Sequence, residues 1–170
     1  MCTTRPRLAL LALLALGARS AHAQDVEEIY RGTLVGLSGV VVSLSHISDD
    51  LVQAGLDSAT LITDTELRLR QGGIRVLNTT EALATPGAGV LVVIVTAGRR
   101  SNTRGWLLHI GTELHQRVRL ERDPTVLTLA PTWRSQGVTA TDDDVARIRQ
   151  IVRDHVDQFV NAWLAANRPK

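Results

Sequence analysis

Cysteine is almost absent from this chain of 170 residues, because its single cysteine is Cys2. The remainder of the sequence therefore excludes disulfides, thiolate metal sites and a cysteine nucleophile. Lysine is as scarce, with Lys170 the only one among 19 basic residues. We interpret this arginine bias as the mark of a GC-rich bacterial coding sequence.

The N-terminus has the three parts of a secretory signal peptide. Arg5 and Arg7 form a basic start, and an apolar run of Leu and Ala follows over residues 8–16. Ala21-His22-Ala23 then supplies small residues for signal peptidase, which places cleavage between Ala23 and Gln24. The run is shorter than the ~20 residues that span a bilayer. Cys2 precedes the run, so we do not expect lipidation there.

Cleavage changes the charge of the functional part. The signal over residues 1–23 takes Arg5, Arg7 and Arg19 and no acid, which leaves 16 basic against 17 acidic side chains. A nucleic-acid partner requires a basic footprint, so we expect none. No later run is apolar enough to span a membrane, and residues 24–170 are predicted to be one soluble domain, periplasmic or secreted.

Two helices are predicted from apolar steps of three and four. The clearest runs over 142–166, with Thr141 as its N-cap and Asp144 at the capping-box position. The other covers 59–71, capped by Asp57 or Ser58 and ended by the glycine pair at 72–73. Within it, Asp64 with Arg68 and Glu66 with Arg70 are expected as ion pairs. The apolar stripe of the helix over 142–166 consists of Val145, Ile148, Val152, Val156, Phe159 and Trp163.

Strands are predicted at 34–44, 74–77, 90–96, 106–121 and 126–133. Alternation in the long strand places Trp106, Leu108 and Ile110 on one face and His109 and Glu113 on the other. The first strand–helix–strand is expected to be a right-handed parallel crossover, and the last three strands an antiparallel meander. The predicted fold is α+β: a two-layer sandwich, mostly antiparallel, in the order β-α-β-β-β-β-α, with both helices on one face.

His109, Glu113 and His115 are the only group resembling a catalytic or metal site. Glu113 and His115 are two residues apart on one strand face, close enough to share a metal. His109 lies about 13 Å from Glu113 along an extended strand and cannot join them without a bulge. The spacing differs from that of a helical H-E-x-x-H motif. We interpret the group as a solvated strand face and expect no cofactor.

Other candidate functional residues have fewer features of a catalytic or metal site. Arg99, Arg100 and Arg104 cluster in a turn and are candidates for a partner contact. His155 is expected at the boundary of the last helix. His46 lies beside Ser48 and two acids, but no G-x-S-x-G elbow, P-loop or dinucleotide fingerprint accompanies them.

Several segments resemble a family of small exported bacterial proteins of unknown function. They are Leu67-Arg68-Leu69-Arg70-Gln71-Gly72-Gly73-Ile74, Gln116-Arg117-Val118-Arg119-Leu120, Thr132-Trp133, Val156-Asp157-Gln158-Phe159 and Trp163-Leu164-Ala165-Ala166-Asn167. The resemblance implies export and a single compact domain, and it transfers no functional residue. In fold alone, the strand–helix–strand opening is similar to envelope assembly domains such as the TolB N-terminal domain.

The sequence leaves three functional hypotheses open. The leading one is a non-catalytic exported domain that binds an envelope protein or forms a homo-oligomer, with the long strand accepting a partner strand if it lies at an edge. The second is a small metal-dependent or hydrolytic enzyme using His109, Glu113 and His115. The third is a small-ligand carrier, which requires an apolar pocket between sheet and helices.

Overall fold

The computed structural model describes residues 28–99, 105–142 and 144–168. Its sheet has the strand order β1-β2-β3-β4, formed by Gly39–Leu44, Ala88–Arg99, Trp106–Leu120 and Asp123–Thr141. β1 and β2 are parallel, and β2, β3 and β4 form an antiparallel meander. The helices are α2 (Asp49–Gln53), α3 (Ser58–Gln71), α4 (Thr79–Ala84) and α5 (Val145–Ala166). The predicted α+β two-layer fold is thus confirmed.

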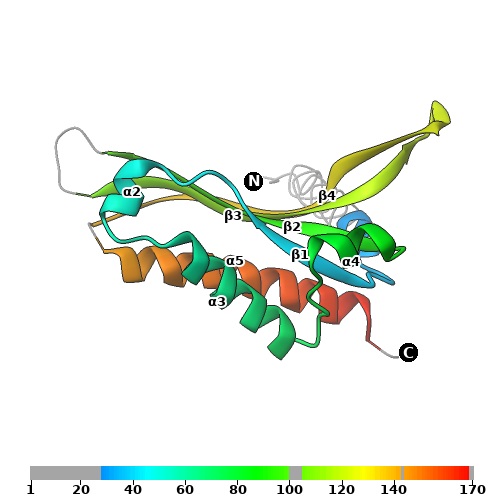
Figure 1. The fold of residues 1–170 in the computed structure, drawn as a ribbon, viewed down its shortest axis with the longest axis horizontal. Coiled ribbons are helices and arrows are strands. Elements are labelled where there is room, and N and C mark those ends of the chain that lie inside the picture. The colour runs from blue at the N-terminus through cyan, green and yellow to red at the C-terminus, as the bar shows by residue number, and fades with distance from the viewer. Residues whose placement is uncertain (1–27, 100–104, 143, 169–170) are drawn as a thin grey trace, which may run out of the picture.

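The long helices α3 and α5 lie side by side on one face of the sheet (Figure 1). Leu61, Thr65 and Leu69 are the buried positions of α3, one helical turn apart. The buried residues of α5 recur in the same way and are Ile148, Val152, Val156, Phe159 and Val160. Both stripes pack on the alternate strand residues Leu91, Val93 and Val95 of β2 and Leu108, Ile110 and Leu114 of β3. This single layer of apolar side chains between the two helices and the sheet is the hydrophobic core.

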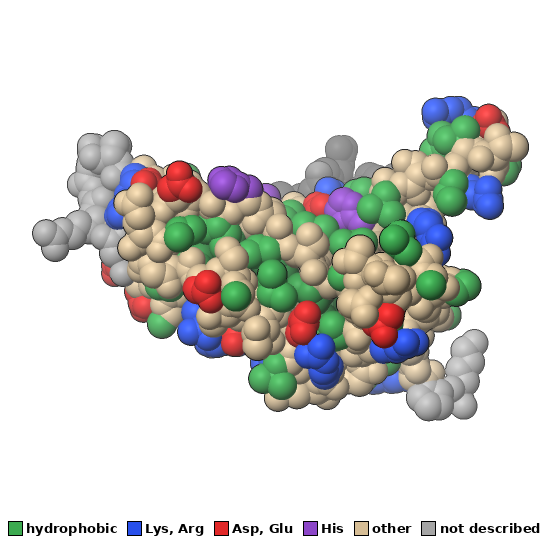
Figure 2. All heavy atoms as spheres, in the orientation of Figure 1, with side chains coloured by type: hydrophobic (Ala, Val, Ile, Leu, Met, Phe, Trp, Pro, Cys, Tyr) green, Lys and Arg blue, Asp and Glu red, His purple; other side chains and the backbone are tan. Residues whose placement is uncertain are grey.

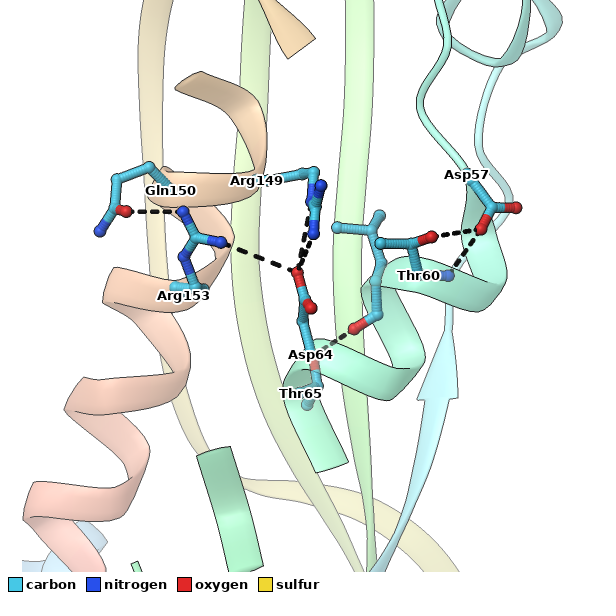
Figure 3. Close-up of polar contacts among 8 residues, drawn as sticks. Asp57, Thr60, Asp64, Thr65, Arg149, Gln150 and Arg153 are labelled. Atoms are coloured by element: carbon cyan, nitrogen blue, oxygen red, sulfur yellow. Dashed lines mark hydrogen bonds and ion pairs between the residues drawn. The ribbon is translucent and has the colours of Figure 1, made fainter. Parts of the chain in front are cut away.

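Polar contacts also hold α3 against α5 (Figure 3). Asp64 accepts a hydrogen bond of 2.7 Å from Arg149 Nη2, and Arg153 lies 3.8 Å away. Arg68 pairs with Asp157 of α5, which raises the pKa of the guanidinium. The expected Glu66–Arg70 pair is present at 3.0 Å, but the expected Asp64–Arg68 pair is not. Each of these two side chains instead takes a partner on the facing helix.

The ends of the helices refine the predictions. Asp57 caps α3 as expected. It accepts hydrogen bonds from the Thr60 hydroxyl, at 2.5 Å, and from the Thr60 N–H, at 2.7 Å, and both lower the pKa of its carboxyl group. Gly73, with φ of 82°, follows the end of the helix. The N-cap of α5 is Asp144 and not Thr141, because β4 continues to Thr141 and Asp144 accepts from the N–H groups of Ala146 and Arg147.

Two further predictions need correction. The segment predicted as a strand over 74–77 forms only an isolated parallel bridge, between Val76 and Val40. The long predicted strand is β3, which lies between β2 and β4 and is therefore not an edge strand. Within the described residues the edges of the sheet are β1 and β4. β4 has 19 residues and pairs with β3 alone, whereas β1 has six residues and forms the additional bridge to Val76.

Beyond the body of the sheet, β3 and β4 continue as a two-stranded hairpin. Pairing between β2 and β3 ends at Gly89 and Gln116, whereas β3 and β4 remain paired from Arg117 and Leu129 toward the turn. We call residues 117–129 the arm, and Figure 1 shows it projecting past every other labelled element. Nearly all of its residues are exposed.

Candidate functional site

Glu113 and His115 point from β3 onto the face of the sheet opposite α3 and α5, which we call the open face. His115 Nε2 lies 2.9 Å from Glu113 Oε2, and the side chains are 25% and 18% exposed. Glu113 Oε1 also accepts a hydrogen bond from Gln136 on β4, at 2.5 Å. Because an ionised carboxylate only accepts, the pair orients His115 with its proton on Nε2.

His109 does not join this pair. It lies six residues before His115 on β3, between Thr96 of β2 and Val138 of β4. Within residues 28–99, 105–142 and 144–168, no three His, Cys, Asp or Glu side chains are placed to hold one metal ion. The structure therefore brings together two of the three candidates, as a hydrogen-bonded pair.

An apolar pocket of about 100 Å³ adjoins His115. It lies between α4 and the open face, at the base of the arm. α4 was not predicted, although Asn78 and Glu81 form a capping box at its N-terminus. His115, Arg117 and Thr79 are the polar residues of the lining, and its apolar ones include Val41, Val90, Leu83 and Leu129.

A second histidine site lies between α5 and β4. Ser135 Oγ is 2.7 Å from Nδ1 of His155 and also donates to Oε1 of Gln158. Burial lowers the pKa of His155, Asp154 opposes this effect, and His109 adds to it. The boundary position expected for His155 is consistent with its intermediate exposure. The hydrogen bond between the His155 imidazole and the Ser135 hydroxyl helps to hold α5 against the sheet.

Of the three predicted arginines of the turn, only Arg99 lies within the described residues. Arg99 stacks over the ring of Trp106, with its guanidinium carbon 3.8 Å from the ring centroid. Such a contact holds a cation against an apolar surface. Arg100 and Arg104 lie outside the described residues, as do the predicted cleavage residues Ala23 and Gln24.

The arm carries several exposed apolar side chains. Val126, Leu127 and Leu129 are 41%, 52% and 53% exposed. Arg117 pairs across the arm with Leu129, and Arg119 with Leu127, so arginine and leucine alternate on one surface. Hydrophobic and basic side chains are visible together there (Figure 2). The arm also continues directly into the free edge of β4.

In the described residues, none of the helices is both long and apolar enough to cross a membrane. Neither models of known families nor curated proteins match the chain. Among solved structures, it is distantly similar to dodecameric PelC from Paraburkholderia phytofirmans, with 14% identity and a TM-score of 0.41 over 74% of this chain and 86% of that one. For a point variant of the same dodecamer the TM-score is 0.44, also at 14% identity, over 75% and 88%.

Proposed function

We propose that this protein is an exported, non-catalytic assembly domain that associates with further copies of itself through the arm and the free edge of β4. The exposed leucines of the arm are the observation that supports this most directly. An isolated two-stranded hairpin is only marginally stable in water. Leu127 and Leu129 remain 52% and 53% exposed, so a binding partner would bury more of both side chains.

The free edge of β4 explains why the partner is a second copy. Two identical strand edges can pair antiparallel about a two-fold axis, because such a pair is complementary to itself. The N–H and C=O groups of β4 that have no partner among the described residues would provide the hydrogen bonds of this added pairing. The carbonyl oxygen of Thr132 is not among them, because it accepts from Thr33 Oγ1. The charges of the arm have both signs, with Glu121 and Asp123 beside Arg119 and Arg122, so opposed copies can match them.

Light scattering after size exclusion tests the proposal on the purified protein over a hundredfold range of concentration. The unchanged chain is expected to contain dimers or larger assemblies, and Leu127→Asp to shift them toward the monomer by at least tenfold in concentration. Leu67→Asp is the matched control, because Leu67 is 53% exposed but lies on α3. A protein that is monomeric throughout contradicts self-association.

The signal-like sequence over residues 1–23 supports the export part of the proposal. Its test is a fusion of those residues to a reporter that is active only outside the cytoplasm, with Leu13→Arg as the control that disrupts the apolar run. A cytoplasmic product that retains its N-terminus contradicts this part of the proposal.

The Glu113–His115 hydrogen bond favours a second candidate, a small metal-dependent or hydrolytic enzyme that uses Glu113 and His115. His109, the third residue predicted for such a site, does not join the pair. On this hypothesis the purified protein carries a stoichiometric metal or hydrolyses an ester, and His115→Ala abolishes the property. Elemental analysis and an ester-substrate panel distinguish it from the assembly domain. A metal-free, inactive protein whose His115→Ala variant still assembles contradicts it.

A further inference from the structure

The pocket at the base of the arm combines an apolar lining with two basic side chains. Val41, Val90 and Ala88 of the sheet face Ala82 and Leu83 of α4 across it, and His115 and Arg117 complete one wall from β3. Among the described residues that line the pocket, none is Asp or Glu. Such a wall complements a negative charge, while the remaining surface complements a hydrocarbon.

Arg117 is the group available to an anionic ligand. It is exposed, and its Nη2 makes a long contact of 3.5 Å with the carbonyl oxygen of Thr85. A guanidinium offers five donors in a planar fork that fits both oxygens of a carboxylate. His115 is held through Nε2 by Glu113. With its proton on Nε2, its Nδ1 is an acceptor, so His115 lines the wall beside Arg117 and does not itself donate to a carboxylate.

The size and the mouth of the pocket define the hydrocarbon. An apolar cavity of ~150 Å³ accommodates one benzene molecule, so about 100 Å³ holds only a few methylene groups. A longer chain must leave between Leu83 and Leu129, which are 74% and 53% exposed. These leucines would then be covered by the ligand, which accounts for their exposure in its absence.

We propose that this pocket binds an aliphatic monocarboxylate of the fatty-acid class, with Arg117 holding the carboxylate beside His115 and the chain lying between α4 and the open face. The occupant is chosen by charge complementarity, because a neutral or cationic apolar molecule would offer the Arg117 guanidinium no anionic partner. The site lies within one chain and does not depend on the proposed self-association.

Titration calorimetry with sodium decanoate, kept below its micellar concentration, tests this site on the purified protein. We expect saturable binding at one site per chain. Arg117→Gln is expected to weaken it about tenfold, the equivalent of one charge-assisted hydrogen bond. Arg119→Gln is the matched control, since Arg119 lies on the same face of β3, two residues farther along the arm and outside the lining, and should change affinity less than twofold.

Two further comparisons separate the parts of the proposal. Decanol and decyltrimethylammonium share the chain without the carboxylate and should bind at least tenfold more weakly. Leu129→Ala should reduce decanoate affinity several-fold, while Leu127→Asp, which tests assembly, should leave it within twofold. Absence of saturable binding, equal losses in Arg117→Gln and Arg119→Gln, or equal binding of decanol and decanoate would each overturn the proposed site.

Discussion

The two faces of the sheet come from the same strands, yet they have opposite surroundings. On the covered face, Leu91, Val95 and Ile110 are completely buried beneath α3 and α5. On the open face, Leu107 and Val138 are 53% and 70% exposed. Strand alternation supplies apolar side chains to both faces, but the long helices α3 and α5 cover only one, and the short helix α4 lies over part of the other. The covered face accounts for the stability of the fold, whereas the open face and the arm offer surface for binding.

The largest expected contrast between the faces is in stability. Phe159 is fully buried and packs edge-on against Trp133, with ring centroids 5.1 Å apart. Phe159→Ala is expected to cost about 3–5 kcal/mol, because it leaves a cavity under the sheet. Leu127→Ala on the arm should change the free energy of unfolding by less than about 0.5 kcal/mol. Urea unfolding at a concentration where the protein is monomeric measures both, and similar losses would refute the contrast.

A glycine on the open face provides the next test. A Cβ on Gly111 would lie 2.4 Å from the carbonyl oxygen of Ser135 and 2.7 Å from Cγ of Gln136. Gly111→Ala therefore forces β3 and β4 apart locally and should cost about 1–3 kcal/mol. Gly98→Ala is the control on β2, where an added Cβ meets nothing within 4 Å. Thermal unfolding compares the melting temperatures of the two variants. Equal shifts in melting temperature would mean that β4 moves to accommodate the added methyl group at little cost.

The contact between α3 and α5 should respond more weakly. Asp64→Asn removes the charge that binds Arg149 and Arg153, and we expect a loss of about 0.5–1 kcal/mol. The loss should shrink in 1 M NaCl because exposed charges are screened. Glu66→Gln is the control within α3, since it breaks only the pair with Arg70 and should cost about 0.3–0.5 kcal/mol. A larger effect of Glu66→Gln in urea unfolding would contradict the bridging role of Asp64.

The smallest effect concerns His155, whose pKa burial lowers from 6.5. Below pH 6.5 the unfolded chain binds this proton before the folded chain does, so stability falls as the pH falls from 6.5 through the folded pKa. Asp154 and His109 also act on this titration. His155→Gln should remove this component from unfolding curves measured between pH 5 and 8. Ser135→Ala removes the hydrogen bond to His155 but leaves the buried core residues of α5 unchanged, and it should retain this component, which separates burial from the hydrogen bond.

Sequence patterns were sufficient for the covered face. The apolar stripe of α5 and the alternation of β3 each depend on local periodicity, and buried residues such as Ile148 and Ile110 follow it. The predicted end of the last strand at 133 was wrong, because the polar residues 134–141 have no strand-like pattern. They remain in β4 only because each pairs with β3, a partner outside any local window.

The open face could not be derived in the same way. Whether a strand lies at an edge depends on the order of strands in the sheet, which local periodicity does not report. The pocket requires α4, a helix of six residues with no buried position, so no apolar stripe marked it. The pairing of Glu113 with His115 was visible in their spacing, but Gln136 joins them through the register of β4. The family resemblance remains a prediction.

The place of α5 in the chain has a consequence for the proposed export. This helix follows all four strands and provides five buried residues to the layer that covers them. Until it emerges from a translocation channel or a ribosome, β1 to β4 expose the apolar surface that it will cover. A chain lacking its last helix should stay unfolded and competent for threading. Delayed completion of the core is thus compatible with the proposed export of an unfolded chain.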